Sequence, residues 1–383
     1  MSIYFINFAG MKRVLMITGG LRRNGTEAFM LNAIRNMDPK EVQFDFLVGE
    51  RTGSDVEQEA MALGAQIHTF IPRKQGWKAH IRSLDAFFKA NAHRYDAVHF
   101  NGNSFTGIMP LVYARKYGIP VRIAHSHNVS TAGLHNRLLH RLNRARIAGI
   151  ATHYLGCSES ALDWGFKGTR ARKEARVVNN GIDLDSFRFN PETRDRVRRQ
   201  IGLDKAFTVG SVAAFRKAKN HSFMIDVLRE LVKLRPDTVM VFAGDGELKQ
   251  EIERRVSDEG LSSHVLFLGS RSDVSDLMQA LDLLLFPSLY EGFGIVAIEA
   301  QAAGLPVVAS TAVPRETDLT PLIRYIPLDA PATEWAREIA QTELSPRSDV
   351  YPALRKHDIK ETCRLLMEVY NSGASKPRSD STT

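Results

Sequence analysis

The sequence predicts an α/β protein made of two Rossmann-like domains, each built on a doubly wound parallel sheet. Its 383 residues suit two domains of ordinary size. Apolar runs of strand type alternate with helical patterns along the chain, and such alternation is typical of parallel sheets. Residues 283–310 show the order strand, glycine-rich loop, helix, strand, which places backbone N–H groups at the carboxyl edge of a sheet.

In the first half of the chain, the expected strands are separated by helical patterns such as residues 81–90. Gly20 and Gly25 follow the first strand, and a helix opens directly after them. Glycine there suits close approach of a ligand to the backbone, but ordinary turn chemistry is an alternative explanation. The expected strands cover residues 12–18, 44–48, 66–70, 97–100 and 121–125.

The second half follows the same plan and begins after a helix rich in Arg and Asp over residues 186–203, expected to be an exposed linker. A last helix is expected over residues 358–370, where apolar side chains recur at helical spacing. The expected strands cover residues 207–212, 239–243, 265–268, 283–286 and 307–310.

Two acids surround the glycine-rich loop of residues 283–310. Glu291 precedes Gly292 and Gly294, and Glu299 follows eight positions after Glu291. Eight residues are about two helical turns, so both carboxylates could lie along one ligand. Two hydrogen-bond acceptors beside a phosphate cradle suit a nucleotide-sugar, which carries a diphosphate in its middle and hydroxyls at both ends. The alternative is one solvated and one structural glutamate.

The stretch SLYEGFGIVAIEAQAAGLPVVAS, residues 288–310, resembles the signature of the large family 4 type of retaining GT-B glycosyltransferases. This family includes many polysaccharide and lipopolysaccharide assembly enzymes, and the resemblance covers nearly the whole chain. It implies the GT-B fold, in which the two Rossmann-like domains face each other across a cleft. It also implies that Glu291 binds sugar hydroxyls and Glu299 the ribose. The helix N-terminus at Gly292, Phe293 and Gly294 would hold the phosphates.

A second resemblance to the family lies in AAFRKAKNH, residues 213–221. Lys219 stands just before a helix start and matches the lysine that neutralises the diphosphate in the family. The family usually has Gly-Arg where this chain has Ala213-Ala214, so the arginine that helps the lysine is missing. Arg216, two positions after Ala214, is the candidate to replace it, and the alternative is a solvated Arg216.

Further segments resemble the family at the nucleotide side and at the cleft. Gly244 belongs to a Gly-x-Gly turn after a strand, and Arg271 lies in a post-strand loop that borders the nucleotide base in the family. GGLRRNGTEAFMLN, which contains Gly20 and Gly25, resembles the first loop beside the cleft. Residues 153–157 resemble the late strand of the first domain.

Two histidines follow closely at the end of the strand over residues 121–125. Imidazoles at the carboxyl end of a strand lie at the ligand edge of a sheet. The segment IAHSHN resembles a family segment that contributes a histidine near the donor sugar, and we favour His127 over His125 for this role. The alternative is one buried and one exposed ring with no function.

Composition and charge narrow the class of protein. The net charge of +8 fits phosphorylated substrates or an anionic membrane surface, and nucleic acid is disfavoured because no zinc-finger spacing or RNP-like run appears. Cys157 and Cys363 have no disulfide or metal spacing and fit a reducing compartment. No apolar run reaches transmembrane length, and residues 1–10 are interpreted as an extension and not a signal peptide. We therefore expect a cytoplasmic protein.

A basic amphipathic helix is expected over residues 134–147. Leu134, Leu138 and Leu142 recur at every fourth position, and Arg137, Arg141 and Arg144 lie beside them. Two interpretations have equal weight. The leucines could pack in the core with the arginines solvated, or the helix could dock on anionic lipid head groups at the inner face of the membrane.

The resemblance implies a retaining, metal-independent glycosyltransferase that needs no cofactor. The donor is a nucleotide-sugar, with a UDP-sugar favoured, and the acceptor is a glycan or a polyprenyl-diphosphate-linked sugar of surface polysaccharide assembly. A nucleotide-sugar epimerase and a non-catalytic sugar-nucleotide-binding protein are the alternatives. The expected parts are an extension (1–10), an acceptor-side domain (11–185), a nucleotide-sugar domain (186–354), a helix returning to the first domain (355–372) and a disordered tail (373–383).

Overall fold

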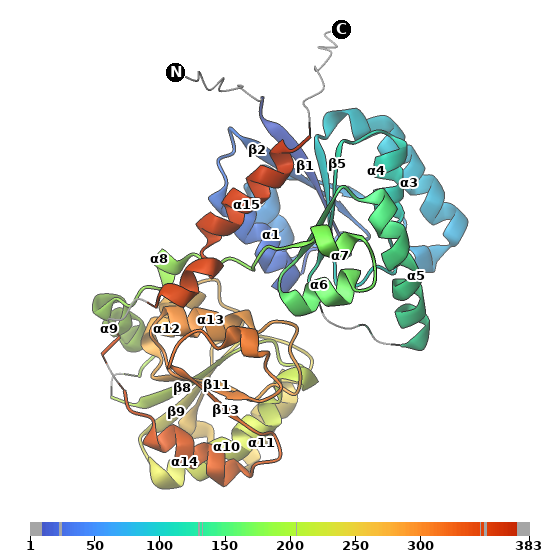
Figure 1. Ribbon diagram of the computed structural model, residues 1–383. Helices are drawn as coiled ribbons and strands as arrows, with labels where there is room; N and C mark the ends of the chain where they lie inside the picture. The colour runs from blue at the N-terminus through green and yellow to red at the C-terminus, as the bar shows by residue number, and fades with distance from the viewer. Residues whose placement is uncertain are drawn as a thin grey trace, which may run out of the picture. The chain divides into compact units, whose positions relative to one another are not determined.

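The computed structural model describes residues 10–22, 25–128, 131, 133–203, 205–344, 346–347 and 351–373 (Figure 1). Residues 1–9 of the expected extension and residues 374–383 of the tail expected to be disordered lie outside this set. The described residues divide into two compact units. The first contains those up to Gly181 and those from Ile359 on, and the second runs from Ile182 to Asp358.

The first unit is built on a parallel sheet with the strand order β3-β2-β1-β4-β5-β6-β7. Its strands are β1 (Lys12–Thr18), β2 (Val42–Val48), β3 (Gln66–Thr69), β4 (Ala97–Gly102), β5 (Val121–Ser126), β6 (His153–Gly156) and β7 (Arg176–Val177). Its helices are α1 (Gly25–Asn36), α2 (Asp55–Ala62), α3 (Trp77–Asn91), α4 (Met109–Lys116), α5 (Leu134–Ile150), α6 (Glu159–Phe166), α7 (Ala171–Glu174) and α15 (Ile359–Asn371).

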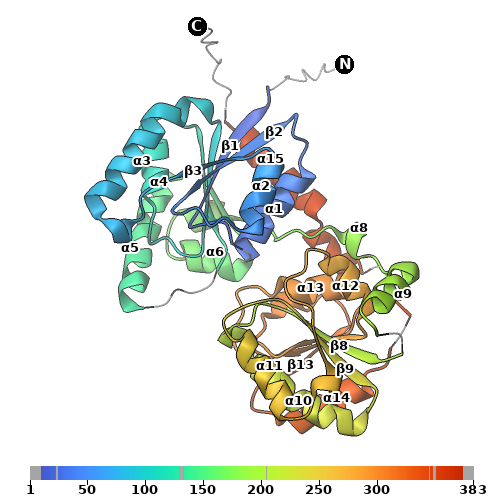
Figure 2. The ribbon, with the colours of Figure 1, turned by 180° about the vertical axis from the view of Figure 1, so that it is seen from behind.

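Helices cover both faces of this sheet, and its central strands are therefore rich in apolar residues that point to either face (Figure 2). Val14 and Met16 of β1 pack into a core shared with α1, α2 and α15, while Leu15 and Ile17 pack into a core shared with α3, α4, α5 and α6. The C-terminal helix α15 packs against α1 and buries Tyr370 completely. Helix α15, which follows the second unit in the sequence, therefore completes the core of the first unit.

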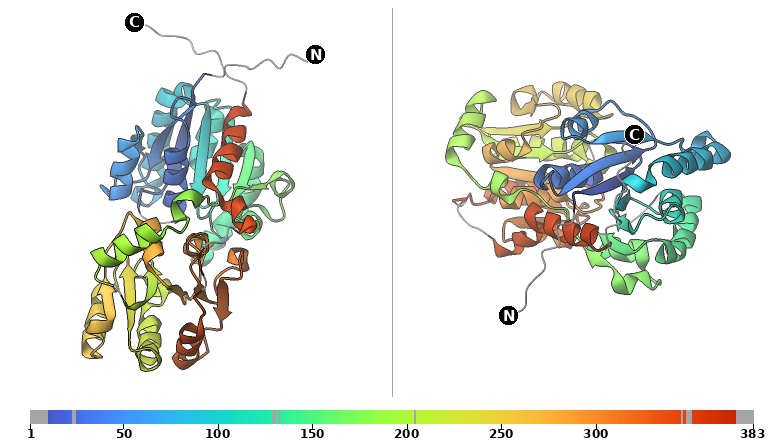
Figure 3. Two further views of the ribbon diagram at one scale, coloured as in Figure 1. Left: turned by 90° about the vertical axis from the view of Figure 1, so that its left-hand side faces the viewer. Right: turned by 90° about the horizontal axis from the view of Figure 1, so that it is seen from above.

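The second unit repeats this design with a parallel sheet of strand order β10-β9-β8-β11-β12-β13 (Figure 3). Its strands are β8 (Phe207–Val212), β9 (Thr238–Ala243), β10 (Val265–Phe267), β11 (Leu283–Phe286), β12 (Val307–Ser310) and β13 (Ile323–Ile326). Its helices are α8 (Leu184–Phe187), α9 (Pro191–Gln200), α10 (His221–Leu234), α11 (Lys249–Asp258), α12 (Val274–Ala280), α13 (Ile295–Ala302) and α14 (Ala332–Gln341). The core with α10, α11 and α14 lies on one face of the sheet, and the core with α8, α12 and α13 lies on the other.

The predicted fold class is confirmed, because each unit is a doubly wound parallel sheet. The strands expected at residues 12–18, 207–212, 283–286 and 307–310 have these bounds in the structure. The prediction missed β7 and β13, which lie at sheet edges and are short.

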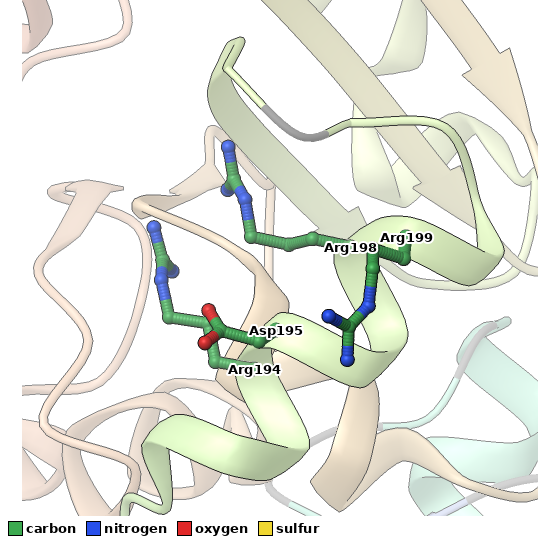
Figure 4. A pocket seen from close by; sticks show the side chains of 4 residues that line it. All are labelled: Arg194, Asp195, Arg198 and Arg199. Carbon is green, nitrogen blue, oxygen red and sulfur yellow. The ribbon is translucent and has the colours of Figure 1, made fainter.

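The expectation of one exposed linker helix over residues 186–203 is wrong. Pro191 starts a separate helix, α9, because proline is well suited to the first turn of a helix. Arg194 and Arg198 extend their guanidinium groups to the same side of α9, where they bind the carboxylate of Asp282 at 2.6 and 3.4 Å (Figure 4). Because Asp282 directly precedes β11, the hollow beside these arginines lies at the amino edge of the sheet, away from the loops described next.

Candidate functional site

The candidate site lies at the carboxyl edge of the second sheet, where the strand order reverses. β8 is followed outward by β9 and β10 on one side, and by β11, β12 and β13 on the other. Such a reversal leaves a crevice between the loops that follow the two central strands, and ligands of open α/β sheets bind in this crevice. The loop after β8 carries Lys219 and the loop after β11 carries Glu291, so the sheet order brings the two predicted residues together.

Lys219 and Glu291 form an ion pair in the structure. Lys219 Nζ lies 2.6 Å from Glu291 Oε1, and Ser288 Oγ donates to the same oxygen at 2.6 Å. The ammonium group also lies 5.5 Å from the centroid of the Phe286 ring. The lysine side chain remains 25% exposed and that of the glutamate 10%, so the ammonium group can still reach a ligand. The pair therefore fixes a cation at the mouth of the crevice.

Hydrogen bonds join the two loops. Leu289 N donates to Ala218 O at 2.8 Å, and Asn220 Nδ2 donates to Pro287 O at 3.2 Å. Asn220 adopts a left-handed conformation with φ of 59°, which asparagine tolerates better than most residues. Ser310 Oγ at the end of β12 donates to Ser288 O at 2.5 Å. The crevice is therefore held in shape before any ligand binds.

The sequence analysis missed Ser288, Asn220 and Ser310 as parts of this arrangement. Each stands within two residues of a strand end or a helix start, which is the signal that could have identified them. Their partners, however, lie on other loops, and local sequence does not specify these pairings.

The glycine loop turns sharply into α13. Gly294 is the N-cap residue with φ of 87°, and a Cβ added there would lie 3.3 Å from the Phe286 ring. The backbone therefore passes close to the end of β11, and Gly292 and Phe293 precede the first turn of the helix. Of the two glutamates, Glu299 lies in α13 and Glu291 precedes it, because α13 begins at Ile295. The estimate of two helical turns between the glutamates is thus wrong, although both flank the same loop.

Glu299 is partly buried, and its carboxyl group has no hydrogen-bond or ion-pair partner among the residues that the structure describes. Burial raises the pKa of Glu299 to about 7. A desolvated carboxylate without a donor is unfavourable, and a ligand hydroxyl would relieve this state. Glu299 is therefore better suited to receive a ligand than to hold the fold together.

Replacing Glu299 by glutamine is expected to stabilise the ligand-free protein increasingly as the pH rises from 5 to 8. The folded-state pKa is raised, so the folded protein binds more protons than the unfolded chain in this range, and the native glutamate loses stability as it ionises. Urea unfolding at several pH values measures this difference. A constant difference between the variant and the parent would show that Glu299 is not desolvated.

The remaining predicted residues of the second unit lie on neighbouring loops. Gly244 follows β9, and a Cβ there would lie 2.0 Å from Ala213 O, so only glycine lets the loops after β8 and β9 meet. Arg271 follows β10 and is held by Asp273 through two hydrogen bonds of 2.8 and 2.5 Å. Arg216 is exposed in the same loop as Lys219. The structure places all three at the carboxyl edge, with the Arg271 guanidinium already bound to a carboxylate.

Gly20, Gly25 and His127 lie at the carboxyl edge of the other sheet, in the first unit. Gly20 is buried, and a Cβ there would lie 3.3 Å from Thr52 Cγ2. Gly25 starts α1 in open space, so packing does not explain this glycine. Thr18 Oγ1 at the end of β1 donates to the buried Glu27 at 3.0 Å. The sequence analysis did not single out Glu27 as a buried acid.

The two histidines after Ala124 are both buried, so the alternative of one exposed ring is wrong. His125 belongs to a hydrogen-bond chain in which its Nδ1 lies 3.0 Å from His99 Nε2, and His99 Nδ1 lies 2.9 Å from the Tyr370 hydroxyl. His127 Nε2 lies 3.0 Å from Asn101 Oδ1, and within the described part of the chain its Nδ1 has no partner.

Burial also keeps these histidine rings uncharged. It lowers the pKa of His99 and of His127 to about 3, and that of His125 well below its usual value. All three imidazoles are therefore neutral at pH 7. Because Asn101 Oδ1 can only accept, His127 Nε2 carries the ring hydrogen, and the unpartnered Nδ1 can accept one hydrogen bond from a ligand. His125 Nε2 also has no partner among the described residues, but His125 is fully buried whereas His127 is 7% exposed, which makes His127 the better candidate to meet a ligand.

The described residues lack two other kinds of feature. They contain no cluster of three or more His, Cys, Asp or Glu side chains that could hold a metal ion. They also contain no helix that is both long and apolar enough to cross a bilayer.

Two family models and several known proteins match this chain. The family model "Glycosyltransferase Family 4" matches residues 23–186, and "Glycosyl transferases group 1" matches residues 193–319. EpsF of Bacillus subtilis (strain 168), which is named as a glycosyltransferase, is 33% identical over 379 residues, covering 95% of this chain and 98% of EpsF. A UDP-Gal:alpha-D-GlcNAc-diphosphoundecaprenol alpha-1,3-galactosyltransferase of Escherichia coli is 28% identical over 60% of this chain and 62% of its own.

A solved structure supports the same fold. HepE of Anabaena, crystallised in complex with UDP, superimposes with a TM-score of 0.76 over 94% of this chain and all of its own, at 20% sequence identity. At this identity the likeness concerns the fold alone.

Proposed function

The chain belongs to the glycosyltransferases of the family 4 and group 1 type, and from this premise we propose that it transfers a sugar from a UDP-sugar to a lipid-linked acceptor in surface polysaccharide assembly. The observation that carries the proposal is the Lys219–Glu291 pair beside a helix N-terminus at the switch point of the second sheet. A fixed cation and free N–H groups together suit a diphosphate.

Transfer breaks the bond between the anomeric carbon of the donor sugar and the phosphate oxygen, and forms a bond between that carbon and an acceptor oxygen. The departing diphosphate gains negative charge. Lys219 and the N–H groups around Gly292, Phe293 and Gly294 are placed to stabilise this charge, with Arg216 as the further cation. These cations would do the work that a metal ion does elsewhere, so we propose a metal-independent reaction that needs no cofactor.

The nucleotide would occupy the loops around the crevice. Glu299 would accept hydrogen bonds from the ribose hydroxyls, because its carboxylate is desolvated and unpartnered among the described residues. Gly244 and the loop of Arg271 would border the base, and Glu291 would bind sugar hydroxyls while it orients Lys219. In the first unit, Gly20, Gly25 and His127 would contact the sugar or the acceptor.

The stereochemical outcome is proposed to be retention. The acceptor would attack from the face that the diphosphate leaves, and a departing phosphate oxygen would take the acceptor's proton. Two side chains of the candidate site are poorly suited to act as a general base: burial lowers the pKa of His127 to about 3, and the Glu291 carboxylate already accepts from Lys219 and Ser288.

The donor and acceptor are proposed from the relatives. UDP is bound in HepE, and the E. coli relative is named for transfer from UDP-Gal to a diphosphoundecaprenol-linked sugar. A diphosphate-linked acceptor is anionic, as the net charge of +8 would favour. Such acceptors lie in the membrane, so we place the protein in the cytoplasm, at the inner face of the cytoplasmic membrane.

The proposed function is tested by incubating the purified protein with a panel of UDP- and GDP-sugars and a polyprenyl-diphosphate-linked sugar. We expect release of UDP that depends on the acceptor, with a glycosidic product whose anomeric configuration matches the donor. Conversion of the donor sugar without an acceptor would identify an epimerase. Tight donor binding without any product would identify a non-catalytic binding protein.

A further inference from the structure

Helix α5 presents an apolar stripe to solvent. Leu134, Leu138 and Leu142 are 82%, 60% and 58% exposed, so these leucines do not pack in the core. The buried side of the helix is formed by other residues, namely His140, Asn143, Ile147, Ala148 and Ile150. Exposed leucines at i, i+4 and i+8 lie on one line along a helix and span about 80° of its circumference. Solvent exposure of such a stripe is unfavourable and indicates a partner surface.

Cationic side chains flank the stripe. At about 100° per residue, Arg137 and Arg141 lie along one edge of the stripe, and His135 and Arg146 lie along the other. All four are exposed. This arrangement, with an apolar centre and basic edges on the outer side of a helix, is typical of helices that lie in a membrane interface.

The arginines of α5 have no anionic partner in the part of the chain that the structure describes. The helix contains no Asp or Glu. Arg137, Arg144 and Arg146 donate only to neutral oxygens, those of Thr131, Trp164, Lys167 and Asn143. Elsewhere in the chain, exposed arginines such as Arg35, Arg196 and Arg364 pair with carboxylates. The helix therefore carries uncompensated positive charge beside its leucines.

We propose that α5 docks the protein on an anionic lipid surface, with the three leucines among the acyl chains near the head groups and the arginines at the lipid phosphates. Burial of the leucines among the acyl chains would favour binding, and the arginines would be attracted to the anionic head groups. The charge complementarity selects a lipid surface over a second copy of α5, because two such helices would bring their arginines together. This proposal deepens the membrane location proposed above and does not depend on the donor or on the chemistry.

The test is flotation of the full-length protein with vesicles of phosphatidylcholine, with and without phosphatidylglycerol. We expect binding that requires phosphatidylglycerol and weakens as salt is added. Leu138→Gln/Leu142→Gln and Arg137→Gln/Arg141→Gln should each lower the vesicle partition coefficient about tenfold or more, because each removes two of the contributing side chains. The matched control is Leu234→Gln/Leu344→Gln, which changes two exposed leucines outside α5 and should bind as the parent does.

Two results would overturn the docking proposal. One is binding that the α5 variants leave unchanged. The other is absence of vesicle binding together with a change of oligomeric state in Leu138→Gln/Leu142→Gln, which would show that the stripe joins protein copies. Transfer to a soluble acceptor analogue is measured on the same variants and should equal that of the parent. If that transfer is absent in the parent as well, the proposed function fails while the docking result stands.

Discussion

Replacing Lys219 by alanine is expected to lower kcat about 100- to 1000-fold, which is the usual effect of removing one preorganised group that stabilises developing charge. The change removes the cation at the crevice and leaves the Glu291 carboxylate, only 10% exposed, with the Ser288 hydroxyl as its remaining hydrogen-bond donor among the described residues. An uncompensated carboxylate would then face the departing diphosphate. Initial rates with saturating donor and acceptor measure the effect.

The matched control is Lys249→Ala on α11. The Lys249 side chain is also 25% exposed and also lies near a carboxylate, that of Glu253 at 3.9 Å, but it belongs to the helix surface. This variant should keep the parent's rate. In the double variant Lys219→Ala/Glu291→Gln, UDP should bind more tightly than in Lys219→Ala alone. Equal rates for Lys219→Ala and Lys249→Ala would show that Lys219 has no role in the reaction.

The first unit is expected to lose stability steeply as the pH falls below about 6.5. His99, His125 and His127 have lowered pKa values because the fold buries them as neutral rings. These histidines protonate near pH 6.5 in the unfolded chain, whereas in the folded unit His99 and His127 protonate near pH 3 and the pKa of His125 is well below its usual value, so stability is complete above pH 6.5 and falls as the pH is lowered from there. Each histidine contributes about 1.4 kcal/mol per pH unit in this window, and three give about 4 kcal/mol per pH unit.

Hydrogen exchange of peptides from β4 and β5, corrected for the intrinsic effect of pH, measures the opening of this unit between pH 7.5 and 5. His99→Asn should lower the slope of the opening free energy against pH by the equivalent of about one bound proton, because one buried titrating ring is removed. The control His135→Gln removes an exposed histidine of α5 and should leave the slope unchanged. A slope that is the same for all three proteins would mean that the buried rings are charged in the folded unit.

The strands of the fold were predictable because each sheet is buried on both faces. Under that condition strands are rich in consecutive apolar residues, as in Leu283–Phe286, and such a run stands out from the sequence. The pairing of Lys219 with Glu291 was not predictable, since it depends on β8 and β11 being neighbours while β9 and β10 lie between them in the chain. Sheet order is a long-range property, and local patterns do not specify it.

Helix α5 shows a second limit of sequence patterns. Its leucines have the spacing of a core face, yet they are exposed. The face of α5 that is buried includes two polar residues, His140 and Asn143. Asn143 Nδ2 donates to Phe105 O at 2.7 Å, and His140 accepts from Phe105 N at 3.0 Å and stacks on Trp164. These hydrogen bonds make the burial of His140 and Asn143 favourable. Periodicity alone cannot tell which face of such a helix is buried.

A crystal structure of the protein with UDP tests the proposed site most directly. We expect the diphosphate to lie within hydrogen-bonding distance of Lys219 Nζ and of the N–H groups at Gly292–Gly294, with the ribose against Glu299. A diphosphate bound elsewhere would contradict it, for example in the arginine-lined hollow of α9 at the opposite edge of the sheet (Figure 4).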